Sequence, residues 1–206
     1  MMQQIIVSIG REFGSGGLEI AEKLAANLGL PLYDRNLLEK IAEERIETAE
    51  EFETYDEHCS KEQCPQHGHR ITVSKEEKLA HLEFEYMRER ARNKESFVVV
   101  GHCAEKILKD YSGLISIFVH ADQDFKSKRV MEREHVSEEE AIALMKRTDS
   151  QRRAYHDRFC ENHWGESSSY ELNVNSGWLG IDRTVGMLER YILNRKKEME
   201  AAQVQF

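Results

Sequence analysis

Four glycines fall within eight residues near the start of the chain, in the stretch GREFGSGG over residues 10–17. Glycines let a backbone curve closely around an anion. A helix that begins directly after such a loop adds unpaired N–H groups and the positive end of its dipole. The stretch therefore predicts a phosphate site; its residues are Gly10, Gly14, Ser15, Gly16 and Gly17. The alternative is a tight strand-to-helix turn that binds nothing.

A second group of chemically useful residues is the basic stretch KRTDSQRR over residues 146–153, which gathers four cations around the single carboxylate of Asp149. Phosphoryl transfer depends on positive charge placed around the phosphates. Arg11, inside the glycine-rich stretch, is the nearest further cation. The alternative is that the basic stretch forms a solvated helix face with i,i+4 pairs, and that Arg11 points into solvent.

These residues lie between strands and helices that alternate along the chain. Short apolar runs, typical of buried strands, occupy residues 5–9, 30–33, 97–100, 114–119 and 172–175. Helical periodicity follows at 18–28, from about 36, and at 76–93, 103–108, 125–134, 137–157 and 181–197. This alternation predicts an α/β fold with about five parallel strands and helices on both faces, whose ligand site lies at one edge of the sheet. Asp34 is predicted to cap the helix near 36, and Ser137 with Glu140 to form a capping box.

Residues 43–75 differ from the rest, being rich in Glu, His and Lys and poor in aliphatic residues. We expect a mobile insertion there. The cluster His58, Cys59, Cys64, His67 and His69 has zinc-ligand types but no paired C-x₂-C. A solvated loop is the alternative to a zinc site.

The composition favours one domain of 206 residues with 40% hydrophobic content. A net charge of −9 argues against non-specific binding to nucleic acid or anionic membranes. No apolar run has the length of a membrane span and no signal peptide opens the chain, so a cytoplasmic location with four reduced cysteines is expected. The sequence does not indicate an oligomeric state.

The opening IVSIGREFGSGGLEIAEKLAANLGLPLYDRNLL resembles the cytidylate kinase-like family, a branch of the P-loop nucleoside monophosphate kinases. FVVVGHCAEKIL, ISIFVHADQDFKSKRVMER, RTDSQRRAYHDRF and LNVNSGWLGIDRTV resemble later motifs of the family in the same order. The resemblance covers nearly the whole chain except residues 43–75. It implies a P-loop NTPase fold in a single kinase-like domain, residues 1–206, with 43–75 as an acceptor-side insertion and 137–165 as a lid.

The chain departs from the kinase pattern at several cations. Monophosphate kinases carry Gly-x-Gly-Lys followed by a hydroxyl residue, whereas this chain has Gly17 at the lysine and Glu19 at the hydroxyl. The cytidylate kinase-like branch shares the missing lysine, but its usual arginine after the paired glycines is here Leu18, and its Gly-Arg after the third strand is Gly101-His102. We expect Arg11 and the lid arginines to supply the missing charge.

The resemblance implies ATP and Mg²⁺ as cofactors and a small nucleotide, such as CMP, as the phosphate acceptor. In its Asp-x-x-Arg motif, Asp149 would take a ribose hydroxyl and Arg152 a phosphate. The expected Mg²⁺ ligands are phosphate oxygens and water, with Ser15 a candidate substitute for the missing hydroxyl. The other implied residues are Arg129, Arg133, Arg147 and Arg153 around the lid, and Asp34, Arg35 and His102 on the acceptor side. The alternatives are a nucleotide-binding protein with little or no catalysis and a kinase of another small molecule.

Overall fold

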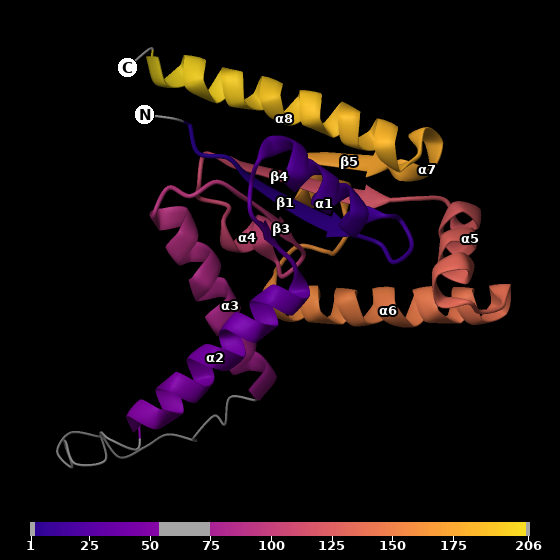
Figure 1. The fold of residues 1–206 in the computed structure, drawn as a ribbon, viewed down its shortest axis with the longest axis horizontal. Helices are drawn as coiled ribbons and strands as arrows, with labels where there is room; N and C mark the ends of the chain where they lie inside the picture. Colours follow the sequence, from indigo (N-terminus) through magenta and orange to yellow (C-terminus); the bar gives the residue numbers. More distant parts are fainter. Residues whose placement is uncertain (1–2, 54–74, 205–206) are drawn as a thin grey trace.

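The computed structural model describes residues 3–53 and 75–204 as a parallel sheet enclosed by helices (Figure 1). The sheet has the strand order β2-β3-β1-β4-β5, and each neighbouring pair is parallel, as the sequence predicts. Its strands are β1 (Ile6–Arg11), β2 (Leu32–Tyr33), β3 (Phe97–Val100), β4 (Leu114–His120) and β5 (Leu172–Asn175).

The helices of the described chain connect these strands in sequence. They are α1 (Gly17–Leu28), α2 (Arg35–Glu53), α3 (Lys75–Arg92), α4 (Ala104–Ile107), α5 (Gln123–Glu134), α6 (Glu138–Phe159), α7 (Ser176–Leu179) and α8 (Ile181–Val204), with a 3₁₀ turn at Ser167–Ser169. The sequence did not predict α7 or the 3₁₀ turn. None of the helices described is long and apolar enough to span a membrane.

The core has two halves, one on each face of the sheet, because alternate strand residues point to opposite faces. In β1, Val7 and Ile9 join α1 and α8 in one cluster, whereas Ile6 joins α3 and α4 in the other. Figure 1 shows α8 along one side of the sheet and α3 and α6 on the other side. Burying one such aliphatic side chain contributes about 1.5–3 kcal/mol. The expected placement of helices on both faces is confirmed.

Helices α5 and α6 pack on each other around a small core of their own. Val130 of α5 and Met145 of α6 are buried there, and Phe13 of the glycine-rich loop packs against them. The predicted capping box opens α6: Ser137 Oγ accepts from Glu140 N–H at 3.3 Å, and the Glu140 carboxylate accepts from Ser137 N–H at 2.9 Å. The helix pair α5–α6 therefore lies against the glycine-rich loop.

Two boundaries differ from the prediction. Strand β1 continues through Gly10 and Arg11, because both pair with β4; Arg11 therefore ends a strand and is not part of the loop. Helix α2 continues through residues 43–53, which were expected to begin the insertion. That segment is short of aliphatic residues but rich in Glu, which is a good helix former. The remaining residues of the expected insertion, 54–74, and the His58–His69 cluster lie outside the described residues.

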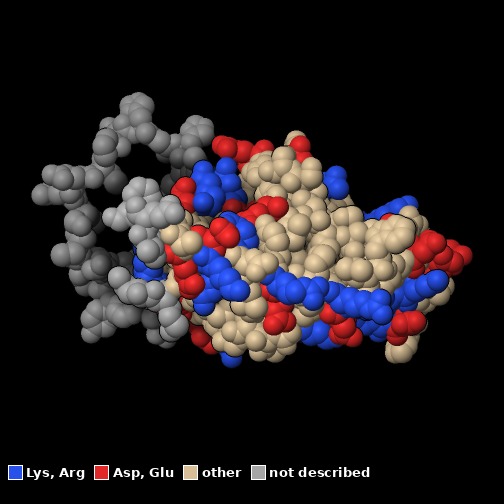
Figure 2. All heavy atoms as spheres, turned by 90° about the horizontal axis from the view of Figure 1, so that it is seen from above, with Lys and Arg blue, Asp and Glu red and all other residues tan. Residues whose placement is uncertain are grey.

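Charge on the face seen in Figure 2 is mixed. A narrow row of Lys and Arg side chains runs across it, with Asp and Glu beside the row. This face therefore presents a narrow basic row and not a broad basic area.

Candidate active site

The glycine-rich loop connects the end of β1 to the first turn of α1. Gly14 and Gly16 have φ angles of 84° and 79°, a left-handed backbone that favours glycine. Gly16 caps α1 without any side-chain hydrogen bond, and the first helical bond runs from Ile20 N–H to the Gly16 carbonyl. The N–H groups of residues 17–19 therefore have no helical partner and point out of the helix end, where an anion binds.

Arg11 sends its side chain across the start of this helix. A Cβ placed on Gly17 would overlap the Cβ of Arg11 and lie 3.0 Å from its Cγ. A Cβ placed on Gly101, directly after β3, would overlap Arg11 Nη1. The side chain thus runs from the end of β1, over Gly17, to the end of β3. Glycine at the position of the usual lysine leaves the space through which Arg11 passes.

The turn that receives the Arg11 guanidinium has an unusual backbone. Gly101, His102 and Cys103 adopt φ angles of 77°, 56° and 55° in succession. The left-handed conformation costs a non-glycine residue about 1–2 kcal/mol. Such strain is concentrated at functional sites. Here the strained turn lies beside the Arg11 guanidinium.

The charge of Arg11 is poorly compensated. Burial, followed by the nearby charges of Arg152 and Arg35, lowers the pKa of Arg11 to about 9, and Asp149 opposes this shift. In the described part of the chain no ion pair joins the Arg11 guanidinium to a carboxylate. A bound phosphate would relieve this excess of positive charge, so the arrangement favours an anion.

Asp149 and Arg152 of α6 hold the loop from the other side. Asp149 Oδ1 accepts the N–H of Phe13 at 2.7 Å, and Arg152 Nη1 donates to the carbonyl of Arg11 at 3.0 Å. The two side chains lie 3.6 Å apart. Burial raises the pKa of Asp149 and lowers that of Arg152. The motif predicted from sequence therefore reaches the loop, but Asp149 is already engaged with the backbone of the protein.

The other basic residues differ in how near they lie to the loop. Arg129 Nη2 donates to Glu19 at 2.8 Å and would lie 3.5 Å from a Cβ on Gly16. Arg133 stacks over the Phe13 ring at 4.8 Å. Arg153 lies over Trp164, and Arg147 is exposed. The structure thus brings Arg129 and Arg133 to the loop and leaves Arg147 and Arg153 outside it.

Ser15 and Glu19 both have partners within the protein. The fully buried hydroxyl of Ser15 donates to the Glu12 carbonyl at 2.8 Å. Glu19, at the position of the usual hydroxyl residue, pairs with Arg129 and also with Lys23 at 3.1 Å. The tight loop turns the Ser15 side chain inward, and its role as a substitute for the missing hydroxyl ligand stays a prediction.

The three acceptor-side residues have protein partners. Asp34 caps α2 as predicted, accepting the N–H of Leu37 at 3.0 Å. Arg35 pairs with Glu39 at 2.6 Å and is 70% exposed, although its charge still reaches Arg11. His102 Nδ1 lies 2.8 Å from buried Glu83, so His102 points to α3.

Two residues of this site are not predicted from the sequence. The Tyr170 ring is buried against Gly10: its hydroxyl would lie 3.2 Å from a Cβ there. Glu12 binds Lys126 of α5 at 2.7 Å and so ties the loop to the helix pair. Neither pairing leaves a local signal, because each joins residues more than a hundred positions apart.

Comparison with known proteins agrees with this geometry. The model of the cytidylate kinase-like family matches residues 6–177. No curated protein matches the sequence significantly. An uncharacterized protein from Eubacterium ventriosum is 38% identical, with a TM-score of 0.74 over 92% of this chain and 98% of the other.

Two more distant structures share the fold. Shikimate kinase from Bacteroides thetaiotaomicron is 15% identical with a TM-score of 0.50, covering 91% of this chain and 98% of its own. A gluconokinase from Sinorhizobium meliloti is 17% identical with a TM-score of 0.50, covering 99% and 98%. At these identities the likeness concerns the fold alone, which is that of the P-loop kinases.

Proposed function

The chain belongs to the cytidylate kinase-like family, and from this we propose that it transfers the γ-phosphoryl group of ATP to a small acceptor, most plausibly a nucleoside monophosphate such as CMP. The observation that carries the proposal is the path of Arg11 over Gly17 to the end of β3. Phosphoryl transfer requires a cation beside the phosphate loop. The loop of this chain has no lysine, and the path of Arg11 supports this residue as the cation.

In this proposal the loop and two arginines share the work. The N–H groups at the start of α1 bind phosphate oxygens, as helix ends do. Arg11 stabilises negative charge on the transferred group, and Arg152, 3.0 Å from the Arg11 carbonyl, completes the basic wall from α6. Asp149 positions the loop through Phe13 N–H. Asp34, Arg35 and His102 remain the proposed acceptor-side residues.

Mg²⁺ fits this site only with few protein ligands. Ser15 is turned inward and Glu19 is paired with Arg129. Mg²⁺ usually keeps several waters and takes most other ligands from substrate phosphates, so this donor set is compatible with it. The ion would supply charge neutralisation between the phosphates. The protein's contribution is the placement of its own cations.

The proposed function is tested by measuring the steady-state rate of ADP formation from ATP, in the presence of Mg²⁺, with a panel of acceptors. The panel contains CMP, the other nucleoside monophosphates and non-nucleotide alcohols. We expect ADP formation that depends on a nucleoside monophosphate. ADP formed only with a non-nucleotide acceptor would show a kinase of another small molecule. ATP binding in calorimetry without ADP formation for any acceptor would show a binding protein.

A prediction about Gly17 separates the Arg11 path from a simple turn. Gly17→Ala keeps an allowed helical backbone but places a Cβ on the Arg11 side chain. We expect the displaced guanidinium to lower ATP affinity about tenfold, while overpacking costs about 1–3 kcal/mol of stability. Calorimetric ATP titration and thermal unfolding measure the two effects.

The matched control is Gly186→Ala in α8, where a Cβ would meet open space. Replacing a helical glycine by alanine there should stabilise the protein by up to about 1 kcal/mol and leave ATP affinity unchanged. If Gly17→Ala also leaves ATP affinity unchanged, Arg11 does not act through the space above Gly17.

A further inference from the structure

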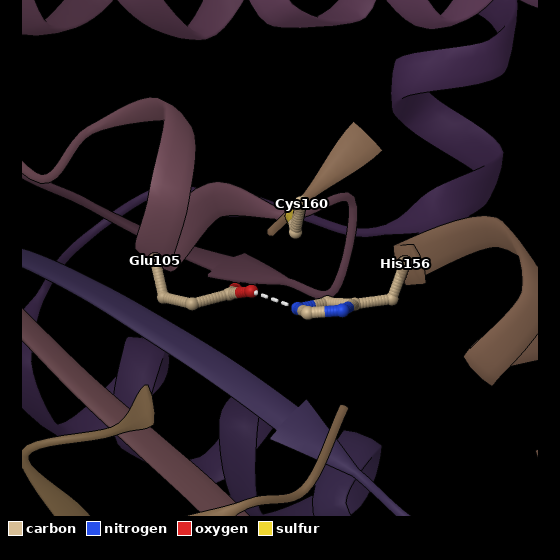
Figure 3. Close-up of side chains that lie close together, drawn as sticks. All are labelled: Glu105, His156 and Cys160. Atoms are coloured by element: carbon tan, nitrogen blue, oxygen red, sulfur yellow. Dashed lines mark hydrogen bonds and ion pairs between the residues drawn. The ribbon is translucent and has the colours of Figure 1, made fainter. Parts of the chain in front are cut away.

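A buried group of metal-ligand side chains lies outside the phosphate loop, at the base of α6. It consists of Glu105 in α4, His156 in the last turn of α6 and Cys160 just after that helix (Figure 3). Their ligand atoms all lie within 4.8 Å of one another, and all three residues are buried. The Glu105 carboxylate is 2.9 Å from His156 Nε2. The proposed phosphoryl transfer gives this group no role.

The imidazole of His156 is oriented as in many metal sites. Its Nε2 faces Glu105, while Nδ1 is buried without a hydrogen-bond partner and lies 3.6 Å from Asp157 Oδ1. Histidine ligands in proteins commonly direct the second ring nitrogen to a carboxylate, which fixes the tautomer. A small movement of Asp157 provides that contact. A buried polar atom without a partner otherwise costs about 1–3 kcal/mol, so the orphaned Nδ1 calls for an explanation.

A second sulfur lies beside this group. Cys103 and Cys160 are both buried free thiols, and a side-chain hydrogen bond joins them. Thiolate is the form of cysteine that binds metals. Cys103 offers a further thiol beside Cys160, outside the three residues whose ligand atoms all lie within 4.8 Å of one another.

We propose that Glu105, His156 and Cys160 bind one divalent transition-metal ion of the zinc type, with Cys103 as the fourth ligand. Mixed sulfur, nitrogen and oxygen donors suit Zn²⁺ in tetrahedral geometry. At normal Zn²⁺ bond lengths the ligand atoms stand about 3–4 Å apart. The ligand atoms of Glu105, His156 and Cys160 therefore need to approach one another only slightly. The anionic ligands neutralise the ion in the apolar interior, where an unbalanced charge is costly.

The ion would hold the C-terminal end of α6, the helix that contacts the phosphate loop, in place. Asp149, Arg152, His156 and Cys160 follow one another at spacings of three and four residues, which places them along one side of α6. Glu105 belongs to α4, which begins just after the strained turn at Gly101. A metal bridge between α4 and α6 would therefore link the helix after the Gly101 turn, where the Arg11 guanidinium lies, to the helix that carries Arg152. The site is a structural one, and its existence does not depend on the proposed function.

The test uses the full chain, purified under reducing conditions and stripped of metal with a chelator, and then titrated with Co²⁺. We expect saturation at about one ion per chain, with sulfur-to-cobalt charge-transfer bands and the strong visible bands of tetrahedral Co²⁺. Zn²⁺ should displace the Co²⁺ and raise the melting temperature. Cys160→Ser should abolish the charge-transfer bands or reduce them strongly, and Cys103→Ser should leave about half of their intensity.

The control separates this site from the His58–His69 cluster, which could itself bind zinc. A double variant, Cys59→Ser with Cys64→Ser, should keep the charge-transfer bands of the wild type. Bands that vanish in this double variant and persist in Cys160→Ser would overturn the proposal. So would folded wild-type protein that shows no sulfur-to-cobalt bands at saturating Co²⁺, a result that holds even if Cys160→Ser fails to fold.

Discussion

Arg11→Ala is expected to lower kcat/KM for phosphoryl transfer by about 10²–10³-fold, the cost of removing a preorganised donor to transition-state charge. The Arg11 side chain passes directly over Gly17 at the start of α1. Arg11→Lys should recover part of the loss, because a point charge remains without the planar fork of donors. Steady-state kinetics with the acceptor found in the panel measure both variants.

The same residue should show a trade between stability and function. The Arg11 guanidinium is partly buried beside Arg152 and Arg35, and burial with these charges lowers its pKa to about 9. Replacing a poorly compensated charge by an apolar side chain often stabilises a protein by about 1–4 kcal/mol. Arg11→Met should therefore melt at a higher temperature than the wild type without nucleotide, and should gain less from added ATP.

The control for Arg11 is Arg88→Ala, which removes an exposed arginine of α3 that pairs with Glu85. Surface pairs of this kind contribute about 0–1 kcal/mol, so neither kinetics nor ATP affinity should change much. Unchanged ATP affinity in both Arg11→Ala and Gly17→Ala would show that the glycine-rich loop is only a turn, and would leave the non-catalytic alternative ahead.

Arg152→Ala is expected to lower kcat/KM by about ten- to hundredfold with little loss of stability. Its guanidinium makes one hydrogen bond to the Arg11 carbonyl and lies 3.6 Å from Asp149. A charge-assisted hydrogen bond is worth about 1.5–3 kcal/mol, which sets the size of the expected change. Parallel kinetics and thermal unfolding distinguish a role toward substrate from a purely structural one.

Asp149 provides the companion measurement for Arg152. Asp149→Ala releases the N–H of Phe13 and removes the carboxylate beside Arg152. The double variant with Arg152→Ala should lose less activity than the two single losses combined, because both residues act on the same loop. Full kcat/KM in Arg152→Ala would remove α6 from the active site.

Local patterns in the sequence were sufficient for most of the fold. The five strands appear as short apolar runs bounded by turn residues, and the helices as apolar residues spaced by three or four. The capping box at Ser137 and the cap at Asp34 were also predicted correctly, because each contact joins residues three positions apart. The end of α2 was not predicted correctly, because a helix rich in Glu shows little apolar periodicity.

The sequence by itself determined that a glycine-rich loop follows the first strand, and that a basic helix with an Asp-x-x-Arg motif lies far along the chain. Only the tertiary structure showed how the side chains around the loop are arranged. It placed Arg11 above Gly17, engaged Glu19 with Arg129, and turned His102 toward Glu83. The physical reason is that the direction of a side chain at a strand end depends on the space left by residues of other elements. Sequence periodicity carries no information about that space.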